Sequence, residues 1–200
     1  MRKVQVVDAD YRVEDDEVTI RCFAVSESGD NLLLTDNDFL PYLYCVPEEN
    51  ELEQVREQIE EAEFEEEGEK LPVRKIEEQE LADGNHEKQV LKVYTSTPPK
   101  IPKLKNRLWE LEKVEECREF DIPFYKRYLI DKDIRPVSWI GVEGEERETP
   151  ELDSQIRVEN IQPEVEAGQD PSFVEMAFDI EVYQDEVIMI SMVSDRFEKV

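Results

Sequence analysis

Residues 121–131 read DIPFYKRYLID, in which a proline is followed by eight residues without a helix breaker. Proline is well suited to the start of a helix, because its backbone angle is already helical and the N–H that it lacks has no partner there. The segment therefore predicts a short helix over residues 124–130.

The chain before this helix alternates short apolar runs with polar turns. Runs of this kind are typical of an antiparallel strand meander. Glutamate-rich residues 51–67 carry apolar side chains at near-helical spacing and predict a surface helix, and three prolines (Pro98, Pro99 and Pro102) open a second helix through Leu104, Leu108 and Leu111. Strands are predicted over residues 4–7, 18–25, 32–35, 42–46, 73–76 and 89–95.

The chain after this helix changes character twice. Residues 136–142 predict a strand, and the acid-rich residues 143–170 read as a connector that holds one strand, over residues 156–161. Residues 173–181 and 186–193 predict two strands joined by a short turn. We therefore expect an α+β chain with a mixed strand and helix domain (1–142), an acidic connector (143–170) and an incomplete second domain (171–200), since two strands cannot bury a sheet face unaided.

Composition narrows the class of protein. A hydrophobic fraction of 39% in 200 residues supports a real core, and no apolar run reaches the length of a membrane span. Three cysteines without paired spacing predict neither a disulfide framework nor a zinc site, which favours the reducing cytoplasm. The formal charge of −28 indicates a solvated acidic surface, one way to stay soluble at high salt, and thus a salt-adapted source.

One window departs from this acidity. Residues 88–107 contain six basic side chains and no acidic one. Phosphate binding draws on Lys and Arg. The window is therefore the part of the chain that we expect to contact nucleic acid.

Two carboxylates lie two positions apart on the strand predicted over residues 173–181. Asp179 and Glu181 project from the same face of an extended strand. Such a pair is suited to Mg²⁺, which binds a few carboxylate oxygens and keeps waters or substrate phosphates as its other ligands.

Four ordered segments resemble one known family. Residues 8–11, residues 39–44, the string DIPFYKRYLID at 121–131, and FDIE at 178–181 followed by VIMIS at 187–191 resemble segments of archaeal-type family B DNA polymerases. The resemblance implies the N-terminal domain of such an enzyme followed by the first strands of an RNase H-like 3′–5′ exonuclease domain. Single-stranded template DNA is the implied partner, and no membrane partner is expected.

The resemblance also implies a pocket in the N-terminal domain that captures uracil in the template. A single-stranded base is turned out, held between aromatic and apolar walls and read along its edge. Ile101 stands where a smaller valine is expected. The implied pocket residues are Tyr11, Pro41, Tyr42, Ile101, Pro102, Ile122, Pro123, Phe124 and Arg127, and the implied phosphate contacts are Lys100, Lys103, Lys105 and Arg107.

In that family the first exonuclease motif supplies two metal-binding carboxylates, which fall on Asp179 and Glu181. Further carboxylates come from later motifs of that family. These 200 residues contain neither those motifs nor the residues of the polymerase site. We therefore expect the chain alone to be inactive, with Mg²⁺ bound only in a completed exonuclease site. Two alternatives stay open: one subunit of a split polymerase completed by a second chain, and a non-catalytic acidic adaptor or gene remnant.

Overall fold

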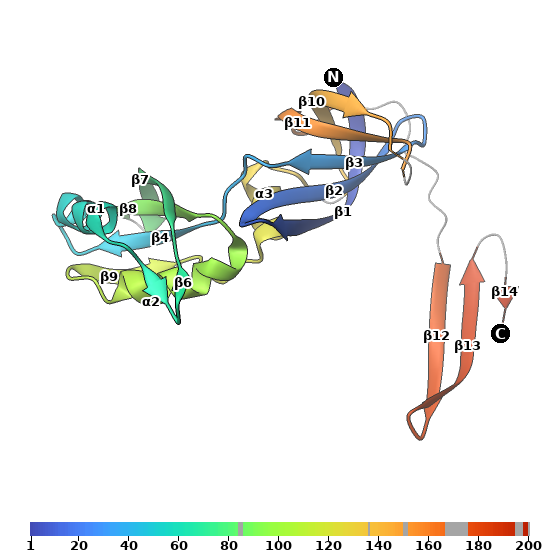
Figure 1. The fold of residues 1–200 in the computed structure, drawn as a ribbon. Coiled ribbons are helices and arrows are strands. Elements are labelled where there is room, and N and C mark those ends of the chain that lie inside the picture. Colours follow the sequence, from blue (N-terminus) through green and yellow to red (C-terminus); the bar gives the residue numbers. More distant parts are fainter. Residues whose placement is uncertain (84–85, 136, 150–151, 167–175, 195–197, 200) are drawn as a thin grey trace.

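The computed structural model describes residues 1–83, 86–135, 137–149, 152–166, 176–194 and 198–199. It has the expected α+β character. Two lobes, a barrel and a helix-covered sheet, lie side by side, and a hairpin follows them in sequence (Figure 1).

The first lobe is a closed five-stranded barrel. Its strands follow the order β1-β10-β11-β3-β2, and β11 runs parallel to β3 while the other pairs are antiparallel. Asp15 and Asp16 form the two-residue turn between β1 and β2, with the positive φ angles that tight hairpins need. The strands are β1 (Arg2–Glu14), β2 (Glu17–Ser26), β3 (Asn31–Asp36), β10 (Trp139–Arg147) and β11 (Ser154–Gln162).

Inward-facing aliphatic side chains fill the barrel. β2 alternates buried and half-buried residues along its length, as a strand with one face on a core should. The helix α3 (Phe124–Asp131) packs against the barrel and adds Phe124 and Tyr128 to its core. The helix predicted from DIPFYKRYLID is thus confirmed, and it is part of the barrel lobe.

The second lobe is a four-stranded antiparallel sheet in the order β7-β8-β4-β9. Its core joins the sheet residues Leu43, Leu91 and Val93 to helix residues such as Val55 and Leu104. The elements are β4 (Tyr42–Pro47), α1 (Leu52–Glu61), the small hairpin β5 (Glu65–Glu66) and β6 (Glu69–Lys70), β7 (Val73–Asp83), β8 (His86–Thr95), the 3-10 turn η1 (Pro98–Lys100), α2 (Ile101–Trp109) and β9 (Val114–Arg118).

One expectation about this lobe was wrong in extent, and one strand was missed. The helix predicted over residues 51–67 ends at Glu61, because the following residues turn back as the hairpin β5–β6, with Gly68 at positive φ in its turn. The strand β9 was not predicted, since its charged residues mask the period of two. It pairs with β4 all the same.

The connector expected over residues 143–170 also needs correction. Residues 143–147 continue β10, and β11 starts at Ser154 and closes the barrel between β10 and β3. Ile156 and Val158 belong to the barrel core. The first domain therefore extends past residue 142 to the end of β11, and only the residues after it connect the barrel to the hairpin.

The two strands expected near the end of the chain are present as β12 (Met176–Tyr183) and β13 (Glu186–Ser194), with a short pairing to β14 (Glu198–Lys199). Gln184 and Asp185 form their turn at positive φ. Both faces of β12 are exposed, so its apolar side chains lack the cover that a complete sheet would have. Residues 171–175 and 195–197 lie outside the described residues.

Candidate nucleic-acid interface

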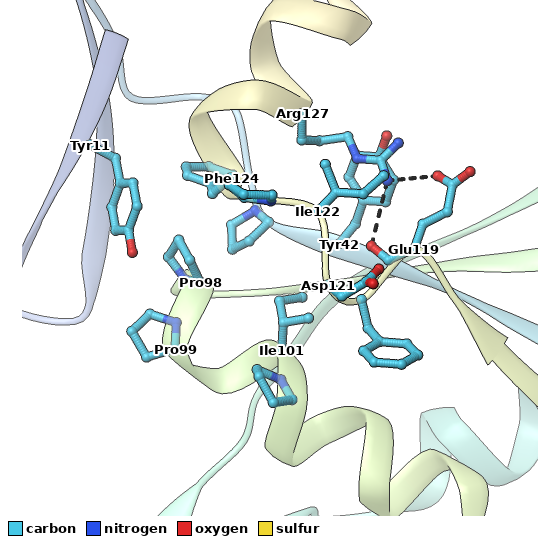
Figure 2. A pocket seen from close by; sticks show the side chains of 14 residues that line it. Tyr11, Tyr42, Pro98, Pro99, Ile101, Glu119, Asp121, Ile122, Phe124 and Arg127 are labelled. Carbon is cyan, nitrogen blue, oxygen red and sulfur yellow. Dashed lines mark hydrogen bonds and ion pairs between the residues drawn. The ribbon is translucent and has the colours of Figure 1, made fainter.

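A cavity of about 290 Å³ lies where the two lobes meet. Segments 37–41 and 119–123 cross from one lobe to the other at this point, and both contribute to the lining. The volume is at the lower end of the range for small-molecule sites, about 300 to 1,000 Å³. The lining residues are Tyr11, Pro41, Tyr42, Pro98, Pro99, Ile101, Pro102, Glu119, Phe120, Asp121, Ile122, Pro123, Phe124 and Arg127 (Figure 2).

Aromatic rings form the wall on the barrel side. Tyr11 on β1 meets Phe124 on α3 edge to face, with ring centroids 5.6 Å apart, and Phe39 supports Phe124 from behind at 5.4 Å. Phe124 is fixed in the barrel core, whereas Tyr11 is 36% exposed and lines the cavity. This wall offers one rigid ring and one accessible ring to a flat ligand.

Prolines form much of the remaining lining. Pro98 and Pro99 open η1, Pro102 stands in the first turn of α2, and Pro123 precedes α3. Proline fixes the backbone and has no N–H to donate. Any backbone N–H that a ligand meets in the cavity must therefore come from the other lining residues.

The backbone of Tyr42 offers one N–H and one carbonyl that β8 does not use. The amide of Thr95 on β8 donates to the carbonyl of Pro41 at 2.9 Å, and the register then makes Tyr42 and Tyr94 the next, non-hydrogen-bonded pair. The N–H and carbonyl of Tyr42 consequently point away from β8, toward the side of β4 on which β9 pairs and the chain continues into residues 119–122. Ile122 carries the last amide before Pro123, which can donate none.

A charged cluster holds the Tyr42 side chain in place. Its hydroxyl donates to Asp131 at 2.7 Å, and the Arg127 guanidinium and the Lys92 ammonium lie 4.9 and 3.7 Å from the centre of its ring. Burial, aided by the bond to Asp131, raises the pKa of Tyr42, which keeps the hydroxyl protonated. Arg127 is itself buried and paired with Glu119 at 2.7 Å, so it braces the cavity from behind.

Comparisons with known proteins fit this architecture. Residues 115–199 match the family described as DNA polymerase family B, exonuclease domain. The DNA polymerase of Methanocaldococcus jannaschii is 31% identical over 188 residues, which cover 92% of this chain and 10% of that protein. The DNA polymerase of Desulfurococcus sp. (strain Tok) is 32% identical over 132 residues, 66% of this chain and 17% of that protein.

A solved structure agrees over almost the whole chain. The family B DNA polymerase of Pyrobaculum calidifontis has a TM-score of 0.79 and 26% identity over 98% of this chain and 26% of its own. This chain belongs to the archaeal-type family B DNA polymerases. It matches their N-terminal domain and the start of their exonuclease domain, and it spans between 10% and 26% of these three relatives.

All nine residues that the resemblance assigned to a uracil pocket line the junction cavity. Pro98, Pro99, Glu119, Phe120 and Asp121 also line it but were not singled out from the sequence. The two prolines were read as the start of a helix, and residues 119–121 were too charged and irregular to suggest a wall. Their adjacency to Ile101 and to Ile122 was the only signal available.

The four phosphate contacts implied by the resemblance differ in their surroundings. Lys100 is only 7% exposed and is paired with Asp16, so its charge joins the two lobes and does not face solvent. Lys103 pairs with Glu69, and Arg107 pairs with Glu110 at 2.9 Å. Within the described residues Lys105 makes no ion pair, and it is the member of the set best suited to meet a phosphate.

The two carboxylates that the resemblance assigned to an exonuclease motif lie on β12. Asp179 and Glu181 stand opposite Ser191 and Met189 of β13 and share one face of the hairpin. Their oxygens suit a hard divalent cation. In the described part of the chain no group of three or more Asp, Glu, His or Cys side chains is arranged to hold a metal, so the pair supplies only part of a ligand set.

The structure also bears on a membrane location. None of the helices that it describes has the length and apolar content needed to cross a bilayer.

Proposed function

We propose that this chain forms the part of a family B DNA polymerase that binds single-stranded template DNA and captures uracil in the junction cavity. One observation carries the proposal: nine residues from β1, β4, α2, α3 and the lobe connections gather around a single small cavity beside the helix that carries Lys105. Neither a completing second chain nor an adaptor role is favoured by the family match.

The proposed recognition uses shape and backbone. A template base that leaves its stack slides between the Tyr11 ring and the proline-lined wall, at the modest cost of unstacking one single-stranded base. The amide and carbonyl edge of Tyr42, with the amide of Ile122, hydrogen-bonds the base. Arg127 and Asp131 hold the Tyr42 side chain and so keep this edge fixed.

Discrimination against thymine follows from the tight lining. Thymine differs from uracil by one methyl group, and in the proposed complex the Ile101 and proline side chains occupy the space that this methyl group would need. A single methyl group in such a pocket is worth about 1 to 3 kcal/mol. The proposed preference for uracil is therefore on the order of tenfold or more.

We further propose that Asp179 and Glu181 hold a divalent metal, Mg²⁺, only once the remaining exonuclease carboxylates are present. Two metals in such a site stabilise the attacking and leaving oxygens of phosphodiester hydrolysis. Within this chain the two residues place their carboxylates on one strand face, and a metal held there would need further ligands that this pair does not supply.

Substitution of Tyr11 tests the uracil proposal. Tyr11→Ala should reduce the preference for a uracil strand over a thymine strand to about twofold or less, because it removes the accessible wall of the cavity. Val13→Ala is the matched control, since Val13 is an exposed apolar residue on the same strand that does not line the cavity. Fluorescence anisotropy with paired oligonucleotides measures both. Equal preferences in the two variants would contradict the assignment of Tyr11.

A further inference from the structure

An exposed aromatic and a cation lie next to the cavity. Trp109, the last residue of α2, is 52% exposed. The Lys105 ammonium, one helical turn earlier, lies 4.8 Å from the centre of the Trp109 ring and 5.0 Å from that of Phe120. Phe120 lines the cavity, so the three side chains form a continuous path from the cavity to the outer end of α2.

The charge of Lys105 distinguishes this path from the rest of the basic window. Its neighbours on α2, Lys103 and Arg107, are each neutralised by a glutamate. Lys105 has aromatic rings beside it and, among the described residues, no carboxylate partner. In a chain with a formal charge of −28, a cation left without a carboxylate beside an exposed indole is suited to a ligand with both a negative charge and a flat ring.

We propose that Trp109, Lys105 and Phe120 form a stacking site for the nucleotide adjacent to the one held in the cavity. The base stacks on Trp109, and Lys105 contacts the phosphate between the two nucleotides. The proposal rests on the proposed function, which supplies the strand, and adds a second base position that is indifferent to sequence because every base has a π face.

Fluorescence of Trp109 tests the stacking site directly. The chain has two tryptophans, so Trp139→Phe leaves Trp109 as the single emitter. Titration with single-stranded DNA carrying one uracil should quench this emission, and the half-saturating DNA concentration should equal the one measured by anisotropy. An abasic position beside the uracil, placed on the 5′ side in one strand and on the 3′ side in another, should abolish the quenching in one strand only. A second variant, Trp109→Ala with Trp139 retained, should show no quenching by DNA. This result checks the assignment to Trp109 without relying on Trp139→Phe.

Substitutions give the size of the effect. Trp109→Ala should weaken binding of the uracil strand roughly fivefold to a hundredfold, and Trp109→Phe should restore most of it, because each stacked base contributes strongly and the Phe ring still stacks. Lys105→Ala should weaken binding and lower the slope of log affinity against log salt by about one. Arg107→Ala, on the same helix, should change both less, since Glu110 already neutralises it.

The outcomes separate the two proposals. If the unaltered chain prefers uracil but Trp109 emission does not change and Trp109→Ala binds normally, the stacking site is wrong and the cavity proposal stands. If the unaltered chain binds uracil and thymine strands equally, the cavity proposal fails, and the stacking site as its neighbour fails with it.

Discussion

A chain that ends at Val142 is expected to lose the cooperative unfolding of the barrel, whereas a chain that ends at Glu166 should keep it. The shorter chain lacks β11, which supplies Ile156 and Val158 to the core and pairs with both β3 and β10. Each of these side chains contributes about 1.5 to 3 kcal/mol by burial, and their removal also exposes the core residues beneath them. Against a typical stability of 5 to 15 kcal/mol this loss is large.

Circular dichroism melts of the two truncated chains and the full chain measure the effect. Nearly equal melting midpoints for the full chain and the chain that ends at Glu166 would show that the hairpin adds little to the lobes. A chain ending at Val142 that melts as sharply and at the same midpoint would mean that residues 143–162 are a connector after all.

Phe124→Ala should lower the free energy of unfolding by about 3 to 5 kcal/mol, the usual cost of removing a buried aromatic ring. The Phe124 side chain is 6% exposed and contacts both Tyr11 and Phe39 within the barrel lobe. Tyr11→Ala should cost much less, because its ring is already partly in solvent. Urea unfolding of the two variants measures the difference, with Phe124→Leu as a control that retains most of the apolar volume.

This contrast matters for the reading of binding data. A loss of DNA binding in Phe124→Ala would mix unfolding with loss of the cavity wall, whereas the same loss in Tyr11→Ala would report on the wall. Equal costs of unfolding for the two substitutions would contradict the placement of Phe124 in the core.

Local sequence pattern was sufficient for most strands and for α3, because alternation and proline placement act within a few residues. It predicted part of β10 and most of β11, but not the full length of β10 or the place of either strand in the barrel. Only the first half of β10 faces the core, and its acidic remainder reads as a loop. The partner of β11 is β3, more than a hundred residues earlier in the chain, and no local signal specifies a parallel pairing at that distance.

The cavity residues were assembled by the resemblance to family B polymerases, since periodicity alone does not bring β1, β4, α2 and α3 to one place. Ion pairs between residues far apart along the chain could not be predicted from the sequence for the same reason. Lys100 read as a free cation in a basic window, yet its partner Asp16 lies 84 residues away on the turn between β1 and β2. Charge counted along a sequence therefore overstated how much of that window is available to DNA.

The central claim is that the junction cavity holds a uracil base and excludes the methyl group of thymine. The most direct measurement is the equilibrium affinity of the unaltered, folded chain for three otherwise identical single strands that carry uracil, thymine or an abasic position. We predict that the uracil strand binds on the order of tenfold more tightly than the thymine strand, and that the abasic strand binds no better than thymine. Equal affinity for all three strands would contradict the claim and leave a module that contacts only the DNA backbone.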